Sequence, residues 1–397
     1  MSSEKKTKLN IFYFNNASGL GTAKAGGTAR HIETARNLIK DGHIIYIVTT
    51  PGAYELYKRE NLRPKKFIVV KAHIFRTQEK SRFDRIISYI VSTLHSIILI
   101  PKLPKCSIVY APSDYFCDVI PSIAYKFYNK GSSLIVMIHH ICKSPFRRKG
   151  SFLFNMLSYV FQRLSFVFIA SFANKVLVYD TPEGKIISSI LKKLGFNGTT
   201  FQVFNGIDYK KISNSIDRNV EKKYYGCFAG GLRATKGIYE LIPIWQHVCY
   251  IFPESKLIIA GEGSKDVVED FKSKIKDAGL TKNFILTGAL DSKTLYQTMS
   301  RSKVFLSTSH EEGWGIAICE ALACETPVVA FDLPAFEFLE NTIIKIQRFD
   351  HEVFANKIIE LVRNSKQIEK LGRRGREFVK KFDWEEISKV EYEILKR

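Results

Sequence analysis

The stretch KLNIFYFNNASGLGTAKAGGTARHIETARNLIKDGHIIYIVTT, residues 8–50, determines the fold class. It begins with an apolar, β-rich run and continues through a glycine-rich loop at residues 19–27. Apolar residues then recur at helical spacing as far as Gly42, and a second buried strand, HIIYIVTT, follows. A strand, a glycine loop, a helix and a strand in this order predict a βαβ unit, which builds parallel sheets.

Continuous apolar runs of strand length recur through the rest of the first half. They are KCSIVYAP (105–112), SLIVMIHH (133–140) and KVLVYD (175–180), and each suits a strand that is covered on both faces. The Asn-Gly step at 205–206 predicts a turn, and the polar stretch SNSIDRNVEKKYY (213–225) predicts a linker.

The same alternation of strands and helices restarts after this linker. The strands are expected in YGCFAGG, SKLIIAGEG, NFILTGAL, KVFLSTS and TPVVAF, with helical segments between them. The pattern predicts an α/β protein of two doubly wound, Rossmann-like domains, at residues 1–207 and 218–382. A last amphipathic helix at 383–397 is expected to pack back on the first domain. The two sheets are expected to face a cleft, onto which the glycine-rich loops at 19–27, 230–237 and 313–315 open.

Length and charge agree with two domains and an anionic partner. The chain has 397 residues, which is more than one ordinary core, and a formal net charge of +21. Residues 1–207 hold 30 Lys and Arg against 11 Asp and Glu, so nearly all of the excess lies in the first half. A nucleic-acid-binding protein would also be basic, but no RNA-binding or zinc-finger motif is found, and the glycine loops would go unexplained.

Cysteine usage and the apolar segments bear on location. The seven cysteines form no Cys-x-x-Cys pair, so we expect reduced thiols in a cytoplasmic protein. The charged lead MSSEKKTKLNIFYF shows no signal peptide. The segments 86–100 and 151–172 are the two candidates for membrane spans. The first is short, and the second contains Asn155, Gln162 and Arg163, so we expect buried or interfacial helices.

Two carboxylates flank a short apolar run in SHEEGWGIAICEALACETPVVAF, residues 309–331. The glycines beside Glu312 place it on a loop and start the next helix near Ile316, whose first-turn N–H groups form an anion site. Glu320 lies about one turn farther along that helix. One extended ligand with an anionic part and hydroxyls would suit this spacing. A capping glutamate and a buried salt-bridge partner explain the spacing about as well.

This segment and several others resemble one enzyme family. Glu312-Gly-Trp-Gly, Glu320-Ala-Leu-Ala and Thr326-Pro-Val-Val resemble the E-x7-E signature of family 4 retaining glycosyltransferases, which have the GT-B fold. The segments AGGTARHIETARNLIKDGHIIYIVTT, VMIHH, FNGID, FAGGLRATKG, LIIAGEG and FILTGAL follow in the family's order and spacing. The resemblance covers most of the chain.

The resemblance implies roles on the donor side. Glu320 would accept hydrogen bonds from the ribose of a nucleotide donor, and Glu312 would hold hydroxyls of the donor sugar. The N–H groups of Gly315 and Ile316 would lie near the sugar and the distal phosphate. Lys236 would neutralise the diphosphate, although a solvated loop lysine remains the alternative.

It also implies roles for other positions. Gly26, Gly27 and Gly288 would line the donor site, the first two by letting backbone approach the phosphates, or they would serve turn geometry alone. His139 would lie against the transferred sugar, while His140 shares the same strand end, so that one of the two could be structural. The first domain would carry the acceptor and the second would bind the nucleotide sugar.

The sequence departs from the family in three places. Gly231 stands where the family usually has an arginine five residues before Lys236, and Arg233 could reach the same phosphate. Glu325 replaces a small residue and is expected to be exposed at a helix end. Pro334 and Ala335 stand where Gly-Gly is common, although Glu337 is retained.

The resemblance therefore predicts transfer of a sugar from a nucleotide diphosphate to an acceptor hydroxyl, with retained configuration. The expected acceptor is a lipid-linked or cell-surface glycan, and the protein is expected in the cytoplasm, peripherally attached to the inner face of an anionic membrane. Catalysis would rest on His139, Glu312 and Lys236, with no cofactor and no essential metal. A nucleotide-sugar epimerase, a phosphorylase and a non-catalytic sugar-nucleotide binder remain alternatives.

Overall fold

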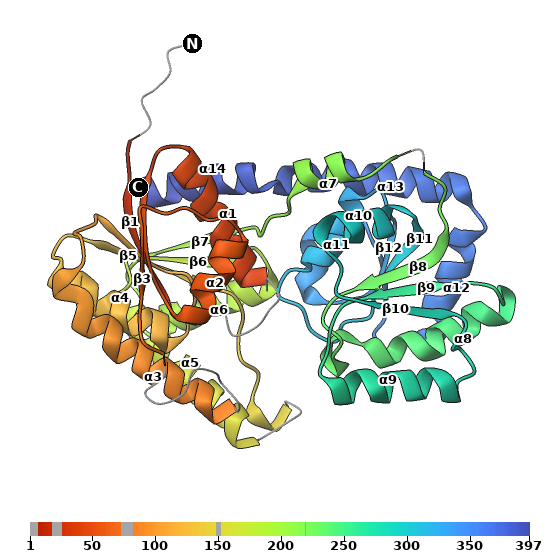
Figure 1. Cartoon of the computed structure of the whole chain (residues 1–397), viewed down its shortest axis with the longest axis horizontal. Helices are drawn as coiled ribbons and strands as arrows, with labels where there is room; N and C mark the ends of the chain where they lie inside the picture. Colours follow the sequence, from red (N-terminus) through yellow and green to blue (C-terminus); the bar gives the residue numbers. More distant parts are fainter. Residues whose placement is uncertain (1–6, 18–25, 73–81, 148–151, 219) are drawn as a thin grey trace, which may run out of the picture. The chain divides into compact units, whose positions relative to one another are not determined.

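The computed structural model describes residues 7–17, 26–72, 82–147, 152–218 and 220–397, and the chain forms two compact units (Figure 1). Unit 1 comprises residues Met1–Asn205 together with Trp384–Arg397, and unit 2 comprises Gly206–Asp383. The C-terminal segment therefore belongs to the unit that begins the chain. Of the glycine loop expected at 19–27, residues 19–25 lie outside the described residues.

Unit 1 is built on a parallel sheet of seven strands in the order β3-β2-β1-β4-β5-β6-β7. The sequence quoted at the outset forms β1, the helix α1 and β2, with Asn10 paired in register with Ile44. The strands are β1 (Asn10–Asn15), β2 (Ile44–Thr49), β3 (Lys66–Val69), β4 (Ile108–Ala111), β5 (Ser133–Ile138), β6 (Lys175–Tyr179) and β7 (Thr199–Val203). Strand order reverses between β1 and β4, which is where open α/β sheets bind ligands.

Helices cover both faces of this sheet (Figure 1). On one face α3 (Arg82–Leu99), α4 (Phe116–Tyr128), α5 (Phe152–Phe172) and α6 (Pro182–Lys193) pack in a row, each against the next. On the other, α1 (Gly26–Lys40) packs against α14 (Trp384–Lys396), and α2 (Pro51–Arg59) follows β2. A buried ion pair between Arg30 of α1 and Glu391 of α14 joins two segments far apart in sequence. Tyr110 of β4 also donates to Glu391, at 3.1 Å.

Unit 2 repeats the arrangement with six parallel strands in the order β10-β9-β8-β11-β12-β13. The strands are β8 (Tyr224–Ala229), β9 (Leu257–Ala260), β10 (Phe284–Gly288), β11 (Ser302–Ser307), β12 (Val328–Phe331) and β13 (Ile344–Ile346). The helices are α7 (Tyr209–Ser215), α8 (Leu241–Ile251), α9 (Lys265–Asp277), α10 (Ser292–Ser300), α11 (Ile316–Ala323), α12 (His351–Val362) and α13 (Ser365–Val379). Helix α7 covers the first three residues of the expected linker, because Tyr209 and Ile212 are buried and anchor it.

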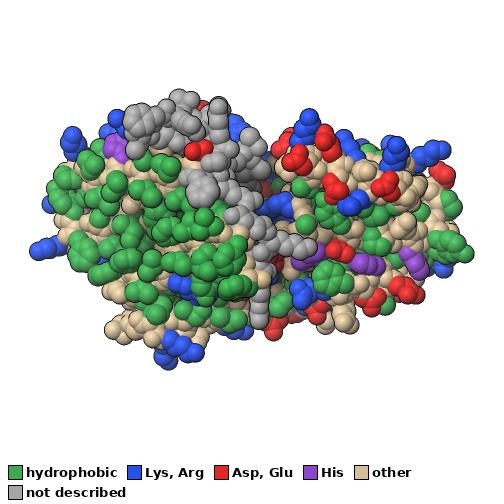
Figure 2. Space-filling view, turned by 90° about the horizontal axis from the view of Figure 1, so that it is seen from below, with side chains coloured by type: hydrophobic (Ala, Val, Ile, Leu, Met, Phe, Trp, Pro, Cys, Tyr) green, Lys and Arg blue, Asp and Glu red, His purple; other side chains and the backbone are tan. Residues whose placement is uncertain are grey.

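Helices α3 and α5 of unit 1 both expose rows of apolar side chains, and both bury some polar side chains against the rest of the unit. Helix α3 buries Ser88, Ser92 and Ser96, and Ser96 accepts a hydrogen bond from Asn16 at 3.0 Å. Its outer face exposes Ile87, Ile90, Leu94 and Ile98. Helix α5 buries polar Gln162 in the same way, and its outer face exposes Phe152, Leu153, Val160, Leu164, Val167 and Phe168. Figure 2 shows hydrophobic side chains gathered over this part of unit 1.

Among the described residues, α5 is long and apolar enough to cross a membrane by length and composition. Its place in the fold argues against a span. The helix connects β5 to β6, which are adjacent parallel strands in register from Ile135 with Lys175. Phe166 and Ile169 of α5 are fully buried in the core beneath the sheet. A helix that must return the chain to the neighbouring strand remains with its sheet, so we assign α5 to the body of unit 1.

Candidate functional site

The loops after β8 and β11 form the centre of the candidate site in unit 2. These strands are neighbours at the point where the strand order reverses, so both loops leave the same edge of the sheet. They are docked on each other, because Thr308 Oγ1 donates to the Gly237 carbonyl at 2.8 Å. Gly237 has φ +68°, and a Cβ there would lie 1.8 Å from the Thr308 carbonyl oxygen. Only glycine fits this approach.

This docking brings Lys236 and Glu312 into direct contact. Lys236 Nζ lies 2.5 Å from Glu312 Oε1, although 76 residues separate them, and both side chains are about one-fifth exposed. Ser309 donates to the same carboxylate oxygen at 2.9 Å. The two residues to which the resemblance gave the diphosphate and the sugar hydroxyls thus lie side by side within reach of solvent.

The start of α11 lies four residues beyond Glu312, at Ile316, as the sequence predicted. Gly315 is its N-cap residue, with φ +92°, and a Cβ there would lie 2.9 Å from Phe336 Cε1. A left-handed glycine packed against an aromatic ring fixes where the helix begins. The helix therefore begins in the same loop that carries Glu312, and its first N–H groups and the Lys236 ammonium are the groups that could hold an anion.

Glu320 lies farther along α11, where Tyr296 of α10 donates to its Oε1 at 3.3 Å. Burial, with the Glu320 charge as the next cause, raises the pKa of Tyr296, so this hydroxyl stays protonated and remains a donor. Glu320 itself is half-buried. Tyr296 was missed by sequence reasoning because nothing in its helix distinguishes it, and its contact becomes visible only when α10 and α11 pack together.

Gly230 and Gly261 lie in the turns that follow β8 and β9, at the same edge of the sheet as Gly288. Gly288 ends β10 with φ +71°, and its carbonyl accepts from Gly261 at 2.9 Å. A Cβ on Gly261 would lie 1.8 Å from the Gly230 carbonyl oxygen, so the turns after β8, β9 and β10 approach one another through backbone alone. The exposed Arg233 folds back over Gly231, with its Nε 3.3 Å from where a Cβ would stand. The guanidinium thus occupies space beside the position where the family's arginine is missing.

In unit 1, the structure brings Gly27 and His139 together. Gly27 is the second residue of α1, directly after Gly26, and His139 follows β5. A Cβ on Gly27 would lie 3.0 Å from both Cε1 and Nε2 of the imidazole. A histidine ring thus lies against Gly27 and leaves no room for a larger residue at position 27. The approach of this backbone to phosphates stays a prediction.

The His139 ring is held in one orientation and one tautomer. Its Nε2 lies 2.8 Å from the Pro112 carbonyl oxygen, which can only accept, so Nε2 carries the proton. Its Nδ1 lies 3.0 Å from the Tyr179 hydroxyl and accepts from it. Burial lowers the pKa of His139 to about 4, and the ring is neutral at pH 7. Both ring nitrogens are engaged within unit 1, whereas the neighbouring His140 is exposed.

One expectation about a departure from the family is wrong. Glu325 is half-buried, with φ +57°, and pairs with Arg376 Nη1 of α13 at 2.7 Å. The sequence had suggested an exposed residue at a helix end. A carboxylate in this left-handed position instead ties the end of α11 to α13, and sequence reasoning missed the pairing because Arg376 lies 51 residues away. Glu337 is exposed within the turn that follows β12.

Two units, each built on a parallel sheet with helices on both faces, are the components of the GT-B class of glycosyltransferase folds. The structure of HepE from Anabaena, in complex with UDP and glucose, superposes with a TM-score of 0.75 at 16% identity, over 98% of this chain and 99% of that one. This likeness confirms the predicted fold. Residues 210–378, which are less than half of the chain, match the family described as "Glycosyl transferases group 1".

Two relatives of known name share parts of the sequence. The capsular polysaccharide biosynthesis glycosyltransferase CapM of Staphylococcus aureus is 27% identical over 241 residues, which are 56% of this chain and 62% of that protein. The poly(ribitol-phosphate) alpha-N-acetylglucosaminyltransferase of Staphylococcus aureus strain COL is 30% identical over 190 residues, 47% of this chain and 38% of that protein. The chain thus spans less than two thirds of the length of either relative.

Proposed function

We propose that the protein transfers a sugar from a nucleotide diphosphate sugar to a hydroxyl of a cell-surface or lipid-linked glycan, with retention of configuration. The contact between Lys236 and Glu312 beside the start of α11 carries this proposal. It places a cation, a carboxylate and free helical N–H groups where two neighbouring loops meet. The similarity to CapM and to the poly(ribitol-phosphate) enzyme supports the acceptor class, and the UDP and glucose bound by HepE support the donor class.

The chemistry that these residues supply is stabilisation of a leaving group. As the bond between the sugar and the diphosphate breaks, negative charge gathers on the distal phosphate and the sugar gains oxocarbenium character. Lys236 and the first N–H groups of α11 offer positive potential that is already in place before the reaction. Once a donor takes up Lys236, the Glu312 carboxylate would be released to accept hydrogen bonds from sugar hydroxyls.

We further propose that transfer needs no divalent metal and no cofactor. Lys236, assisted by Arg233, supplies the positive charge that a metal ion would otherwise bring to the diphosphate. Activity that is abolished by a chelator and restored by Mg²⁺ or Mn²⁺ would contradict this. A phosphorylase would need a pyridoxal group, and its absorbance in the purified protein would favour that alternative.

The decisive experiment is a panel of UDP-, GDP- and ADP-sugars, scored by donor hydrolysis and by thermal shift. One member should raise the melting temperature and be hydrolysed, and Lys236→Ala should abolish both effects. Lys265→Ala provides a matched control, because Lys265 forms an ion pair with Glu269 on exposed α9. Binding without hydrolysis or transfer would favour the non-catalytic binder, and a changed sugar in the released nucleotide would favour the epimerase.

We also propose that unit 1 attaches peripherally to the cytoplasmic face of an anionic membrane. The outward apolar rows of α3 and α5 support this. Exposure of these apolar side chains to water is unfavourable, and contact with the apolar part of a membrane would remove that cost. Exposed lysines at 102, 105 and 143 lie at the end of α3 and after β5, and each cation near an anionic surface adds about 1 kcal/mol. Of the basic loop at 144–150, residues 148–150 lie outside the described residues.

Vesicle co-sedimentation tests the attachment. Leu94→Glu on α3 replaces a side chain that is 56% exposed, and binding to vesicles rich in phosphatidylglycerol should fall severalfold. Val390→Glu on α14, at 54% exposure, is the matched control on the opposite side of the sheet and should leave binding unchanged. Equal loss in both variants, or binding that does not depend on anionic lipid, would contradict the proposal.

A further inference from the structure

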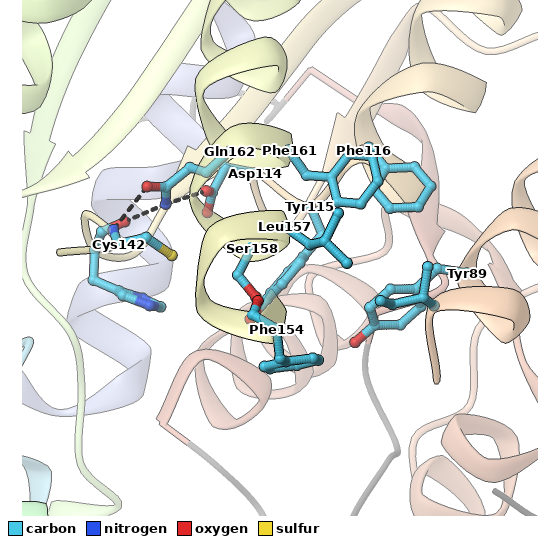
Figure 3. A pocket seen from close by; sticks show the side chains of 12 residues that line it. Tyr89, Asp114, Tyr115, Phe116, Cys142, Phe154, Leu157, Ser158, Phe161 and Gln162 are labelled. Carbon is cyan, nitrogen blue, oxygen red and sulfur yellow. Dashed lines mark hydrogen bonds between the residues drawn. The ribbon is translucent and has the colours of Figure 1, made fainter. Parts of the chain in front are cut away.

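A pocket of about 170 Å³ lies in unit 1 between α3, α4 and α5 (Figure 3). All of its lining residues belong to unit 1, so it is separate from the donor site proposed in unit 2. It lies beside the carboxyl ends of β4 and β5, because Asp114 follows β4, and His140 and Cys142 follow β5. His139 leaves the same strand end, so the pocket adjoins the candidate site of unit 1.

One end of the pocket is polar and firmly built. The amide nitrogen of Gln162 on α5 donates to Asp114 Oδ2 and to the His140 carbonyl, both at 2.8 Å. The Gln162 side-chain oxygen accepts from the Cys142 N–H at 2.7 Å (Figure 3). Asp114 is 5% exposed and Gln162 is 7% exposed. Burial raises the pKa of Asp114, while nearby His140 acts in the opposite direction. This end offers a fixed carboxylate, which suits a hydroxyl and would repel a phosphate.

The other end of the pocket is aromatic and aliphatic. Phe154, Leu157 and Phe161 of α5 face Tyr89 of α3 and Phe116 of α4 across it (Figure 3). The rings of Phe116 and Phe161 lie 5.0 Å apart, and these side chains are only half-buried. Two of the three helices that supply this wall, α3 and α5, also expose the apolar rows described above. The hydrophobic lining and the surface proposed to meet the membrane therefore come from the same helices.

We propose that this pocket binds the hydrocarbon chain of a lipid-carried acceptor, with a hydroxyl of its head group at the Asp114 end. The inference rests on the proposed transfer of a sugar to an acceptor hydroxyl. It specifies in addition where the hydrocarbon chain of that acceptor binds. Polar and apolar ends in one pocket match an amphipathic molecule. The chain of such a molecule would leave the pocket directly into the lipid that α3 and α5 contact.

The test narrows the pocket without altering the apolar rows. Ser158 lines the pocket and donates to the Phe154 carbonyl one turn before it on α5, at 2.9 Å. Ser171 makes the same bond to the Val167 carbonyl at 2.9 Å, at the exposed end of the same helix. Ser158→Phe therefore fills the pocket, and Ser171→Phe adds an equal volume of apolar side chain outside it.

The probe is n-octyl β-D-glucoside below its critical micelle concentration, compared with glucose, with binding measured by calorimetry and ligand-observed NMR. The wild-type protein should bind octyl glucoside at least tenfold more tightly than glucose. Ser158→Phe should weaken this binding at least tenfold, and Ser171→Phe should not change it. Equal binding of the two sugars, equal binding by Ser158→Phe, or no binding by the wild-type protein would overturn the proposal.

Donor hydrolysis by the same three proteins separates this inference from the proposed function. Ser158→Phe should hydrolyse the nucleotide sugar at the wild-type rate, because every donor-side residue of unit 2 is intact. It should also lose transfer to a lipid-linked acceptor. Absence of hydrolysis in all three proteins would count against the transferase, while the octyl glucoside measurement would still decide the role of the pocket.

Discussion

Replacing His139 by glutamine should remove a pH-dependent part of the stability of unit 1. Burial lowers the pKa of this ring to about 4 from its ordinary value of 6.5. The unfolded chain therefore takes up the proton more readily than the folded chain. Stability that is present above pH 6.5 is lost as the pH falls toward 4. The perturbation is His139→Gln, which removes the titrating group and keeps a polar side chain.

The expected magnitude follows from these two pKa values. Acidification from pH 7.5 to pH 5 should cost the wild-type protein about 2 kcal/mol through His139 alone. The substitution also removes ring hydrogen bonds to Pro112 and Tyr179, each contributing about 1 kcal/mol at neutral pH. His139→Gln should therefore be less stable than the wild type at pH 7.5, and the difference should shrink by about 2 kcal/mol at pH 5.

Urea unfolding at the two pH values, followed in the transition that belongs to unit 1, measures this difference. His247→Gln serves as the control, because that ring bonds Asn356 on α12 in unit 2. Its unit 1 transition should keep the wild-type dependence on pH. Parallel pH dependence in His139→Gln and the wild type would refute the argument, since it would mean that His139 is not held neutral by its surroundings.

Three further predictions concern stability and activity. Lys236→Ala should lower the free energy of unfolding by less than about 1 kcal/mol, measured by urea titration, because its ion pair with Glu312 is partly exposed to solvent. The same substitution should lower the rate of donor hydrolysis at least tenfold, measured by steady-state kinetics. Gly315→Ala should destabilise unit 2 by about 2–4 kcal/mol through backbone strain and the clash with Phe336, seen as a lower urea midpoint. Glu391→Gln should cost unit 1 about 3–5 kcal/mol, because it leaves a buried arginine uncompensated, and unchanged unfolding would contradict this.

Much of the fold was predictable because buried parallel strands have a simple signature. The runs that became β1, β2 and β4 are apolar apart from polar residues at the ends of β1 and β2, since helices cover both faces of the sheet. The edge strands β3 and β13 were missed, because β3 carries only partly buried or exposed residues and β13 has three residues. Helix α7 was also missed, because its short sequence is polar apart from two anchoring residues.

The candidate site was predictable where a residue's role depends on its own loop. The glycines around Glu312 place it ahead of α11, and the structure shows that start at Ile316. Contacts between distant segments could not be predicted from the local sequence pattern. Examples are the contact of Lys236 with Glu312 and that of Tyr296 with Glu320. The orientation of α3 was equally hidden. Its periodicity reveals an amphipathic helix, but only packing shows that the serine face points inward.

The position of α14 has a consequence for how the protein is made. Unit 1 is interrupted after Asn205 and resumes at Trp384, with the whole of unit 2 between these points. During synthesis the N-terminal sheet must therefore wait, with Arg30 lacking Glu391, until residues 384–397 emerge from the ribosome. The inserted unit is contained in residues 206–383, so it is complete in sequence before residue 384 and can fold without the C-terminal helix. Nascent chains stalled before residue 384 should accordingly present a protease-resistant second half attached to a digestible first half.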